Sequence, residues 1–153
     1  MTQKYLTIIF LILIGCRPIE PVNFVEIQNV KINSSTDNQI NISAEIVLDN
    51  PNKVKIIIEN IDVDIYAEDI ILVDINENES RELSESSETT VNITGEVNLK
   101  NLEEFLNKKG LAIILGGDDV SLKFIGSIRA KAYGIKDEID INYTINSVKG
   151  LIK

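Results

Sequence analysis

The feature that most constrains this chain is an alternation of apolar and polar side chains that begins near Phe24 and continues almost to the C-terminus. The clearest example is QINISAEIVLD, residues 39–49, in which every second side chain from Ile40 to Leu48 is aliphatic or alanine. Successive side chains of a β-strand point to opposite faces. The pattern therefore predicts a strand with one buried and one solvated face, as is typical of antiparallel sheets.

The same alternation predicts further strands over residues 54–67, 70–75, 90–99, 120–132 and 135–145. Within the first of these the phase slips near Glu59 and Asn60, which indicates a bulge or a tight turn. Residues 76–88 contain almost no apolar side chain, so we expect a solvated loop there. The inner faces of the last two strands are expected to consist of Val120, Leu122, Phe124, Ile128, Ala130 and Ala132, and of Ile135, Ile139, Ile141, Tyr143 and Ile145.

One segment has a helical period instead. In NLEEFLNKKG, residues 101–110, the apolar side chains stand at i, i+3 and i+4. Asn101 with Glu104 suits an N-terminal capping box, and Gly110 suits the position after the last helical residue. About seven strands and one short helix favour the all-β class, namely an antiparallel β-sandwich of the immunoglobulin or fibronectin type III kind.

Composition excludes several classes of function. The formal net charge is −9, and an acidic chain repels phosphate backbones, so we expect no nucleic-acid partner. The chain has no His, which excludes His-based nucleophilic catalysis and His-bearing zinc sites. It has a single Cys, so no internal disulfide can form.

The N-terminus has the pattern of a signal peptide. Lys4 precedes an almost wholly apolar run, residues 5–14, which spans about 15 Å as a helix and is too short to cross a bilayer. The following Leu13-Ile14-Gly15-Cys16 resembles a bacterial lipobox. The resemblance implies that Cys16 is alkylated by diacylglycerol and that the chain is cut between Gly15 and Cys16. The alternative is a buried cysteine in an N-terminal strand.

This interpretation divides the chain into three parts. Residues 1–15 are the lipoprotein signal peptide, 16–23 are the anchor and a tether stiffened by Pro18 and Pro21, and 24–153 are the domain. Loss of Lys4 leaves 14 bases against 24 acids, a net charge of −10. Because Arg17 rather than Asp follows Cys16, analogy with bacterial sorting rules favours the outer membrane, facing the periplasm.

The segment EIVLDNPNKVKIIIENIDVDIYAEDI resembles the late embryogenesis abundant type 2 family, also called the WHy domain. The resemblance extends from Ile40 to Leu102 and rests on an aliphatic strand ending in Asn50, Pro51 and Asn52, followed by a strand that contains Tyr66. One departure is the AEDI sequence after that strand, where the family has a glycine-containing turn. The resemblance implies a sandwich, an association with desiccation or stress tolerance, and no catalytic residues. We interpret Asn-Pro-Asn as structural, because Asn side chains bond nearby backbone; the alternative is a small polar ligand site.

Acidic side chains are the main candidates for other chemistry. Calcium requires six to eight converging oxygens, and a glycosidase requires two carboxylates in a cleft. Alternating acids on a solvent-facing strand more often prevent aggregation, so we expect neither a metal, a cofactor nor catalysis. The acids considered are Asp62, Asp64, Glu68, Asp69, Asp74, Asp118 and Asp119.

Two further sets of residues could bind a partner. Tyr66, Tyr133 and Tyr143 could form a common face, although packing is the expected use. Lys100, Lys108 and Lys109 could contact phospholipid, although a lysine in a last helical turn ordinarily offsets the helix dipole. The sequence thus predicts a membrane-anchored, non-enzymatic lipoprotein of the envelope that acts in stress protection or binding. The alternative is an accessory subunit of a transport or adhesion complex, bound by strand addition.

Overall fold

The computed structural model describes residues 18–34, 39–114 and 119–147. These residues form eight strands and one helix, and every strand pair is antiparallel, which confirms the predicted all-β class. In chain order the elements are β1 (Asn23–Ser34), β2 (Ile40–Asn50), β3 (Ile56–Ala67), β4 (Ile70–Glu77), β5 (Arg81–Leu83), β6 (Ser87–Glu96), α2 (Leu99–Ile114), β7 (Leu122–Ala132) and β8 (Ile135–Ile145).

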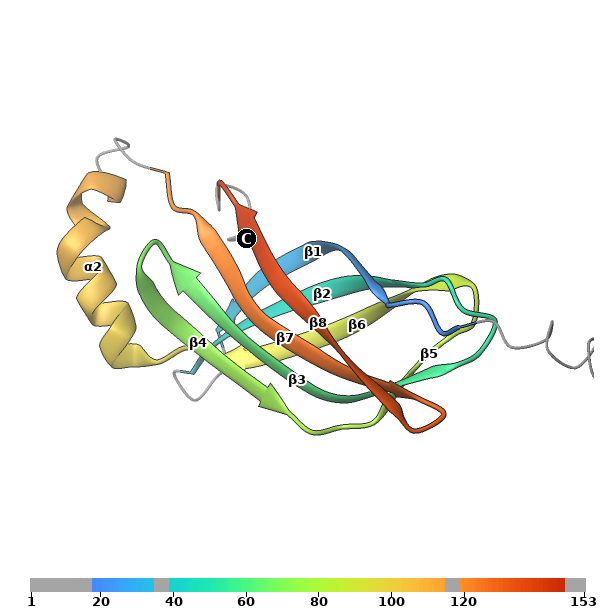
Figure 1. Ribbon diagram of the computed structural model, residues 1–153. Coiled ribbons are helices and arrows are strands. Elements are labelled where there is room, and N and C mark those ends of the chain that lie inside the picture. The colour runs from blue at the N-terminus through green and yellow to red at the C-terminus, as the bar shows by residue number, and fades with distance from the viewer. Residues whose placement is uncertain (1–17, 35–38, 115–118, 148–153) are drawn as a thin grey trace, which may run out of the picture.

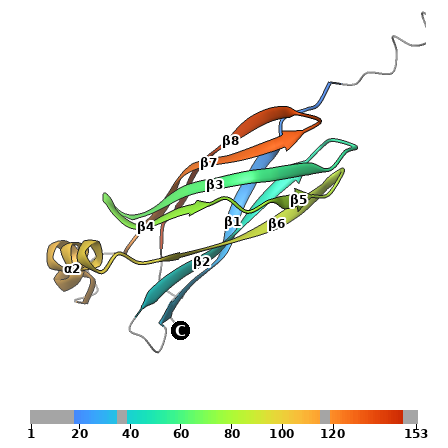
Figure 2. The same cartoon turned by 90° about the horizontal axis from the view of Figure 1, so that it is seen from below.

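The strands form two sheets that pack as a sandwich (Figures 1 and 2). One sheet has the order β1-β2-β6, and the other has the order β4-β3-β7-β8, with β5 also paired to β3. The helix α2 lies at one end, which we call the distal end, and the N-terminal segment and the β7–β8 turn lie at the other (Figures 1 and 2). We call this second end, formed by residues 18–22, 50–55, 84–86 and 131–136, the proximal end.

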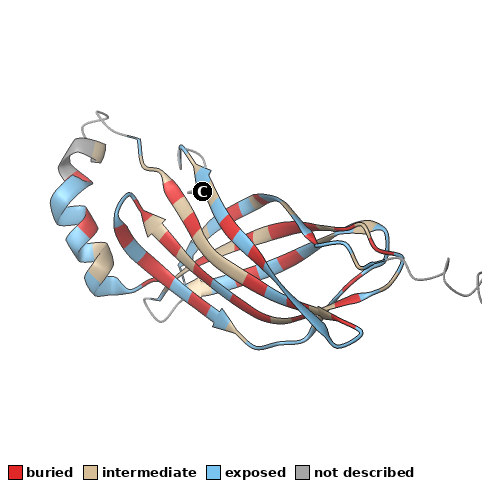
Figure 3. Ribbon diagram, viewed as in Figure 1, coloured by how far each residue is buried: buried red, intermediate tan, exposed pale blue. Residues whose placement is uncertain are grey.

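The core lies between the sheets and follows the predicted alternation. Along β3, Ile61, Val63 and Ile65 are buried while the intervening side chains are not, and Figure 3 shows this alternation of buried and exposed residues on the ribbon. The largest fully buried side chains are Phe124, Ile42, Ile46, Leu48, Ile58, Ile61, Ile65, Leu83, Ile93, Ile128, Ile141 and Val63. In β8 the prediction is wrong for Ile135, which is 61% exposed because it adjoins the hairpin turn.

Two predicted boundaries need correction. The segment 76–88 is not simply a loop, because it contains the three-residue strand β5, whose Leu83 is fully buried. The helix begins at Leu99 rather than near residue 101. Its cap is Asn98, whose Oδ1 accepts hydrogen bonds from the backbone N–H groups of Lys100 (3.1 Å) and Asn101 (3.3 Å). Gly110 lies inside the helix rather than after it.

The predicted phase slip in β3 is confirmed as a bulge. The register against β7 shifts between Ile58 and Asn60, and the Asn60 side chain is buried. Its Nδ2 donates to the backbone oxygen of Glu77 (3.1 Å), and its Oδ1 accepts from Nε of Arg129 (3.2 Å). The buried amide is therefore satisfied, as a polar group in a core must be.

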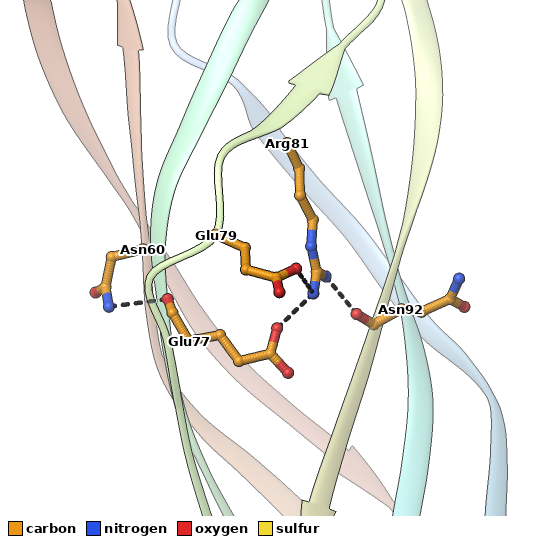
Figure 4. Close-up of polar contacts among 5 residues, drawn as sticks. All are labelled: Asn60, Glu77, Glu79, Arg81 and Asn92. Atoms are coloured by element: carbon orange, nitrogen blue, oxygen red, sulfur yellow. Dashed lines mark hydrogen bonds and ion pairs between the residues drawn. The ribbon is translucent and has the colours of Figure 1, made fainter.

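A polar bridge joins the two sheets beside this bulge (Figure 4). The guanidinium of Arg81, on β5, donates to the carboxylate of Glu77 and to the backbone oxygen of Asn92 on β6, and lies 3.7 Å from the carboxylate of Glu79. Because β6 is an edge strand, Arg81 occupies a backbone acceptor that would otherwise be free to pair with another chain.

Candidate functional site at the proximal end

Asn50 is the centre of the Asn-Pro-Asn turn. It ends β2, and its fully buried side chain makes four hydrogen bonds to other residues. Nδ2 donates to the backbone oxygens of Val54 and Ser84, each at 2.9 Å. Oδ1 accepts from the backbone N–H (3.0 Å) and Nδ2 (3.1 Å) of Asn52. Asn50 thus connects the end of β2 with the segment before β3 and with the segment after β5.

Asn52 connects the turn with the N-terminal segment. Its Oδ1 accepts from the backbone N–H of Glu20 (2.7 Å), and its Nδ2 donates to the backbone oxygen of Glu20 (2.8 Å). Its own backbone oxygen accepts from the N–H of Ser86 (2.8 Å). An amide that pairs with both polar groups of one residue holds that residue as a strand neighbour would. In the structure, the Asn-Pro-Asn turn holds the backbone of Glu20 against the sandwich.

A cavity of about 370 Å³ adjoins the fastened segment. Apolar side chains dominate its wall, and they come from the N-terminal segment, β3 and the β7–β8 hairpin. The lining includes Pro18, Ile19, Val22, Ile56, Ala132 and Ile135. No sequence pattern indicates this cavity, since its walls come from three separate parts of the chain.

The predicted site residues do not come together in one place. Asn50, Pro51 and Asn52 lie at the proximal end, whereas Tyr66 lies near the distal end of β3, where it pairs with Lys123 of β7. Gly15 and Cys16 lie outside the described residues, so their predicted processing stays a prediction. Within the described ranges, no helix is long and apolar enough to span a membrane.

Three of the acidic candidates, Asp62, Asp64 and Asp74, lie on the outer face of the sheet formed by β3 and β4, whereas Glu68 and Asp69 lie in the turn between these strands and Asp119 precedes β7. Asp64 stands directly opposite Asp74. Burial raises the pKa of Asp64, and the negative charges of Asp74 and Asp62 raise it further. No group of three or more metal-ligating side chains occurs in residues 18–34, 39–114 and 119–147. Asp118 lies outside those ranges.

The turn after the Tyr66 strand shows how the chain replaces the family's glycine. Glu68 adopts a φ of +55°, in the left-handed region that glycine favours. Its carboxylate Oε1 accepts from the backbone N–H and the Oγ of Ser121, each at 3.3 Å. These bonds offset part of the strain of the unusual backbone.

The three tyrosines do not form a common face. Tyr143 points inward and contacts Phe24 of β1 edge to face, with ring centroids 5.8 Å apart. Tyr66 lies on the outer face, and Tyr133 lies at the tip of the β7–β8 hairpin. The candidate lysines lie on α2 at the distal end, where Lys108 pairs with Glu104 at 2.8 Å.

The comparisons with known proteins agree with this architecture. The chain resembles the crystal structure of a protein from Archaeoglobus fulgidus, with a TM-score of 0.57 and 17% identity, over 85% of this chain and 98% of that one. It also resembles the solution structure of a protein from Arabidopsis thaliana, with a TM-score of 0.68 and 14% identity, over 86% of this chain and 83% of that one. At such identities the likeness shows a shared fold.

No curated protein matches the sequence. The family model described as late embryogenesis abundant protein matches residues 45–146, which is more than half of the chain and includes the Asn-Pro-Asn turn, the Tyr66 strand and the helix. The chain therefore belongs to the late embryogenesis abundant type 2 family.

Proposed function

We propose that this protein is a lipid-anchored β-sandwich of the bacterial envelope, attached to the outer membrane and facing the periplasm. It acts without catalysis, by protecting or binding other envelope components during desiccation or related stress. Membership of the late embryogenesis abundant family supports the stress role. The Leu13-Ile14-Gly15-Cys16 pattern supports the anchor.

The observation that carries the proposal is the bond between Asn52 and Glu20. Glu20 is only four positions after Cys16, a span of at most about 14 Å. A lipid on Cys16 would therefore hold the sandwich close to the membrane surface, because the Asn-Pro-Asn turn fastens the chain at that point. A protein held in this way presents its proximal end to the membrane and the rest of its surface to the periplasm.

The distribution of charge supports a surface role rather than catalysis. The chain carries 24 acidic residues, and those on β3 and β4 that were considered as ligands face solvent along a sheet. A densely charged surface binds water and resists aggregation as water is withdrawn.

Metabolic labelling with palmitate tests the anchor. Expressed in a bacterium that processes lipoproteins, the full chain should incorporate label and sediment with membranes. The Cys16→Ala variant should lose both properties, and the control Gly15→Ala, which keeps a small residue before the cysteine, should retain them. Label that persists in Cys16→Ala refutes the anchor.

Survival after drying tests the stress role. A deletion strain should survive drying and osmotic shock less well than its parent, and the wild-type gene should restore survival. The Cys16→Ala gene should restore it poorly if attachment is needed. A deletion strain that survives as well as its parent would count decisively against protection.

A second candidate function is that of an accessory subunit, and the distal end favours it. Leu99 and Leu106 of α2 are 54% and 51% exposed, and Ile71 of the adjoining strand is also exposed. Exposed apolar side chains on a helix suit docking to a protein partner. The β8 edge suits strand addition less well, because its exposed positions include several charged residues. A stoichiometric partner captured from detergent extract by the wild type, but not by Leu106→Glu, would support this role, and capture of none would oppose it.

A further inference from the structure

The β7–β8 hairpin exposes two large apolar side chains at the proximal end. Tyr133 is 83% exposed and Ile135 is 61% exposed, and these are the highest values among large hydrophobic residues in the described part of the chain. They flank Gly134, and Figure 3 shows the tip of the β7–β8 hairpin as exposed. Neither side chain is used by the core, so the fold alone gives no reason for them.

The backbone at this tip makes the tyrosine more unusual. Tyr133 has a φ of +50° and Gly134 a φ of +84°, as in a two-residue hairpin turn in which Asn-Gly is the favoured pair. A bulky residue in the left-handed region is strained, and such strain is concentrated at functional positions. An aromatic side chain is thus held in solvent where Asn would make a better turn.

The hairpin lies beside the segment that follows Cys16. Ile135 and Ala132 line the same cavity as Pro18 and Ile19 of the N-terminal segment. Pro18 is two positions after Cys16, at most about 7 Å along the chain. Figures 1 and 2 both show the first described residues of the chain at the end where the β7–β8 turn lies.

Local charges at the hairpin differ from those of the whole molecule. Lys136 and Lys131 approach the carboxylate of Glu59 at 2.8 and 3.6 Å, so two bases face one acid there. Asp137 follows Lys136 in the same strand. In a chain of net charge −9, the charged residues that line the adjoining cavity, Glu20, Lys131, Lys136 and Asp137, sum to zero, so this region repels an anionic lipid surface less than the rest of the molecule does.

We propose that the tip of the β7–β8 hairpin is a second membrane contact, in which Tyr133 and Ile135 enter the boundary between headgroups and acyl chains. Tyrosine is enriched at that depth because its ring is apolar and its hydroxyl is polar. The inference rests on the proposed lipid anchor, which raises the effective concentration of lipid at the tip, so that a weak contact suffices. The anchor brings the proximal end to the membrane, and the second contact fixes the rotation of the sandwich about the anchor, which a single lipid leaves free.

Tryptophan fluorescence tests the contact, since the chain has no Trp and each variant gains a single reporter. The full chain carrying Tyr133→Trp is expressed in a lipoprotein-processing bacterium, extracted from membranes and reconstituted into vesicles with brominated phosphatidylcholine. Leu106→Trp is the matched control, because it is also an exposed apolar position but lies at the distal end. Ile135→Trp provides a second reporter should Tyr133→Trp lose its β-sheet circular dichroism.

The inference predicts that the hairpin reporter shifts to shorter wavelength and loses most of its fluorescence to the bromolipid, while Leu106→Trp keeps its emission. Membrane-bound protein with an unquenched hairpin reporter, or with equal quenching at both positions, overturns the second contact and leaves the anchor intact. Recovery of the protein only in the soluble fraction overturns both. If the tip instead binds another protein, the hairpin reporter should stay unquenched on the membrane-bound protein, which overturns the second contact.

Discussion

The strongest test of the proximal end is removal of the Asn50 side chain. Asn50→Ala leaves two backbone oxygens and two N–H donors of the turn without their partner. Each buried polar group left unpaired costs about 1–3 kcal/mol, and because these costs overlap and water enters part of the space, we expect a total of about 3–5 kcal/mol. Because Asn50 is fully buried, its hydrogen bonds in the wild type are not shared with water, and their loss is therefore felt nearly in full.

Urea unfolding followed by circular dichroism measures this change. A loss of about 3–5 kcal/mol is a large fraction of the 5–15 kcal/mol that stabilises an ordinary domain. The control Asn142→Ala, at an exposed position of β8, should change the free energy of unfolding by less than about 0.5 kcal/mol. If Asn50→Ala costs no more than this control, the idea that the turn fastens the proximal end is wrong.

Asn50→Asp separates the roles of the two halves of the amide. The new carboxyl keeps an acceptor for Asn52 but faces the backbone oxygens of Val54 and Ser84, to which it can donate only when protonated. Burial and these oxygens should raise its pKa in the native state above that in the unfolded chain. The penalty relative to wild type should therefore be present at pH 7 and shrink as pH falls through the raised pKa, which paired unfolding curves would detect.

Three further predictions concern the two sheets. Gly126→Ala should destabilise by several kcal/mol or prevent folding, since a Cβ there would lie 2.0 Å from the backbone oxygen of Asp62; a thermal midpoint near that of the wild type would contradict the close approach. Asp64→Asn should stabilise the fold at pH 7 by less than about 1 kcal/mol, because the raised pKa of Asp64 means that its ionisation opposes folding. In denaturation curves this gain should vanish as pH falls below the ordinary carboxyl pKa. A gain that does not depend on pH would refute this cause. Arg81→Met should cost about 1–2 kcal/mol and speed hydrogen exchange in β6 next to Asn92, and unchanged exchange would show that the bridge does not protect that edge.

Most of the fold could be predicted from the alternation of apolar and polar side chains. In a strand with one buried face, every second side chain is buried, and this does not depend on which strand it pairs with. The alternation located β2, β3, β7 and the bulge at Asn60. It failed for β5, where three residues and one buried side chain, Leu83, are too few to form a pattern. It also failed at Ile135, since a periodic pattern does not show where a hairpin leaves the body of the sandwich.

The site was less predictable than the fold for a physical reason. Asn-Pro-Asn was interpreted as structural because Asn side chains commonly bond nearby backbone, and Asn50 does bond the backbone of Asn52 and Val54. The partner of Asn52 is the backbone of Glu20, 32 residues earlier, and a backbone group carries no signature in a sequence. Likewise, the helix begins two residues before Asn101, where Asn98 is the cap, and Asn101 in the first turn donates to the backbone oxygen of Ile71, a contact that only the tertiary structure defines.

The two bonds between Glu20 and Asn52 also determine how the protein responds to mechanical force. They precede the first pair of the β1–β2 ladder, Asn23 with Asp49, so traction applied at the N-terminus reaches them before it reaches the ladder. Asn50 then passes this force to Val54, just before β3, and to Ser84, just after β5. If Cys16 carries the proposed lipid, a swelling or shrinking membrane would pull first on this hydrogen-bonded turn, and the edge strand β1 would be protected from being separated from β2.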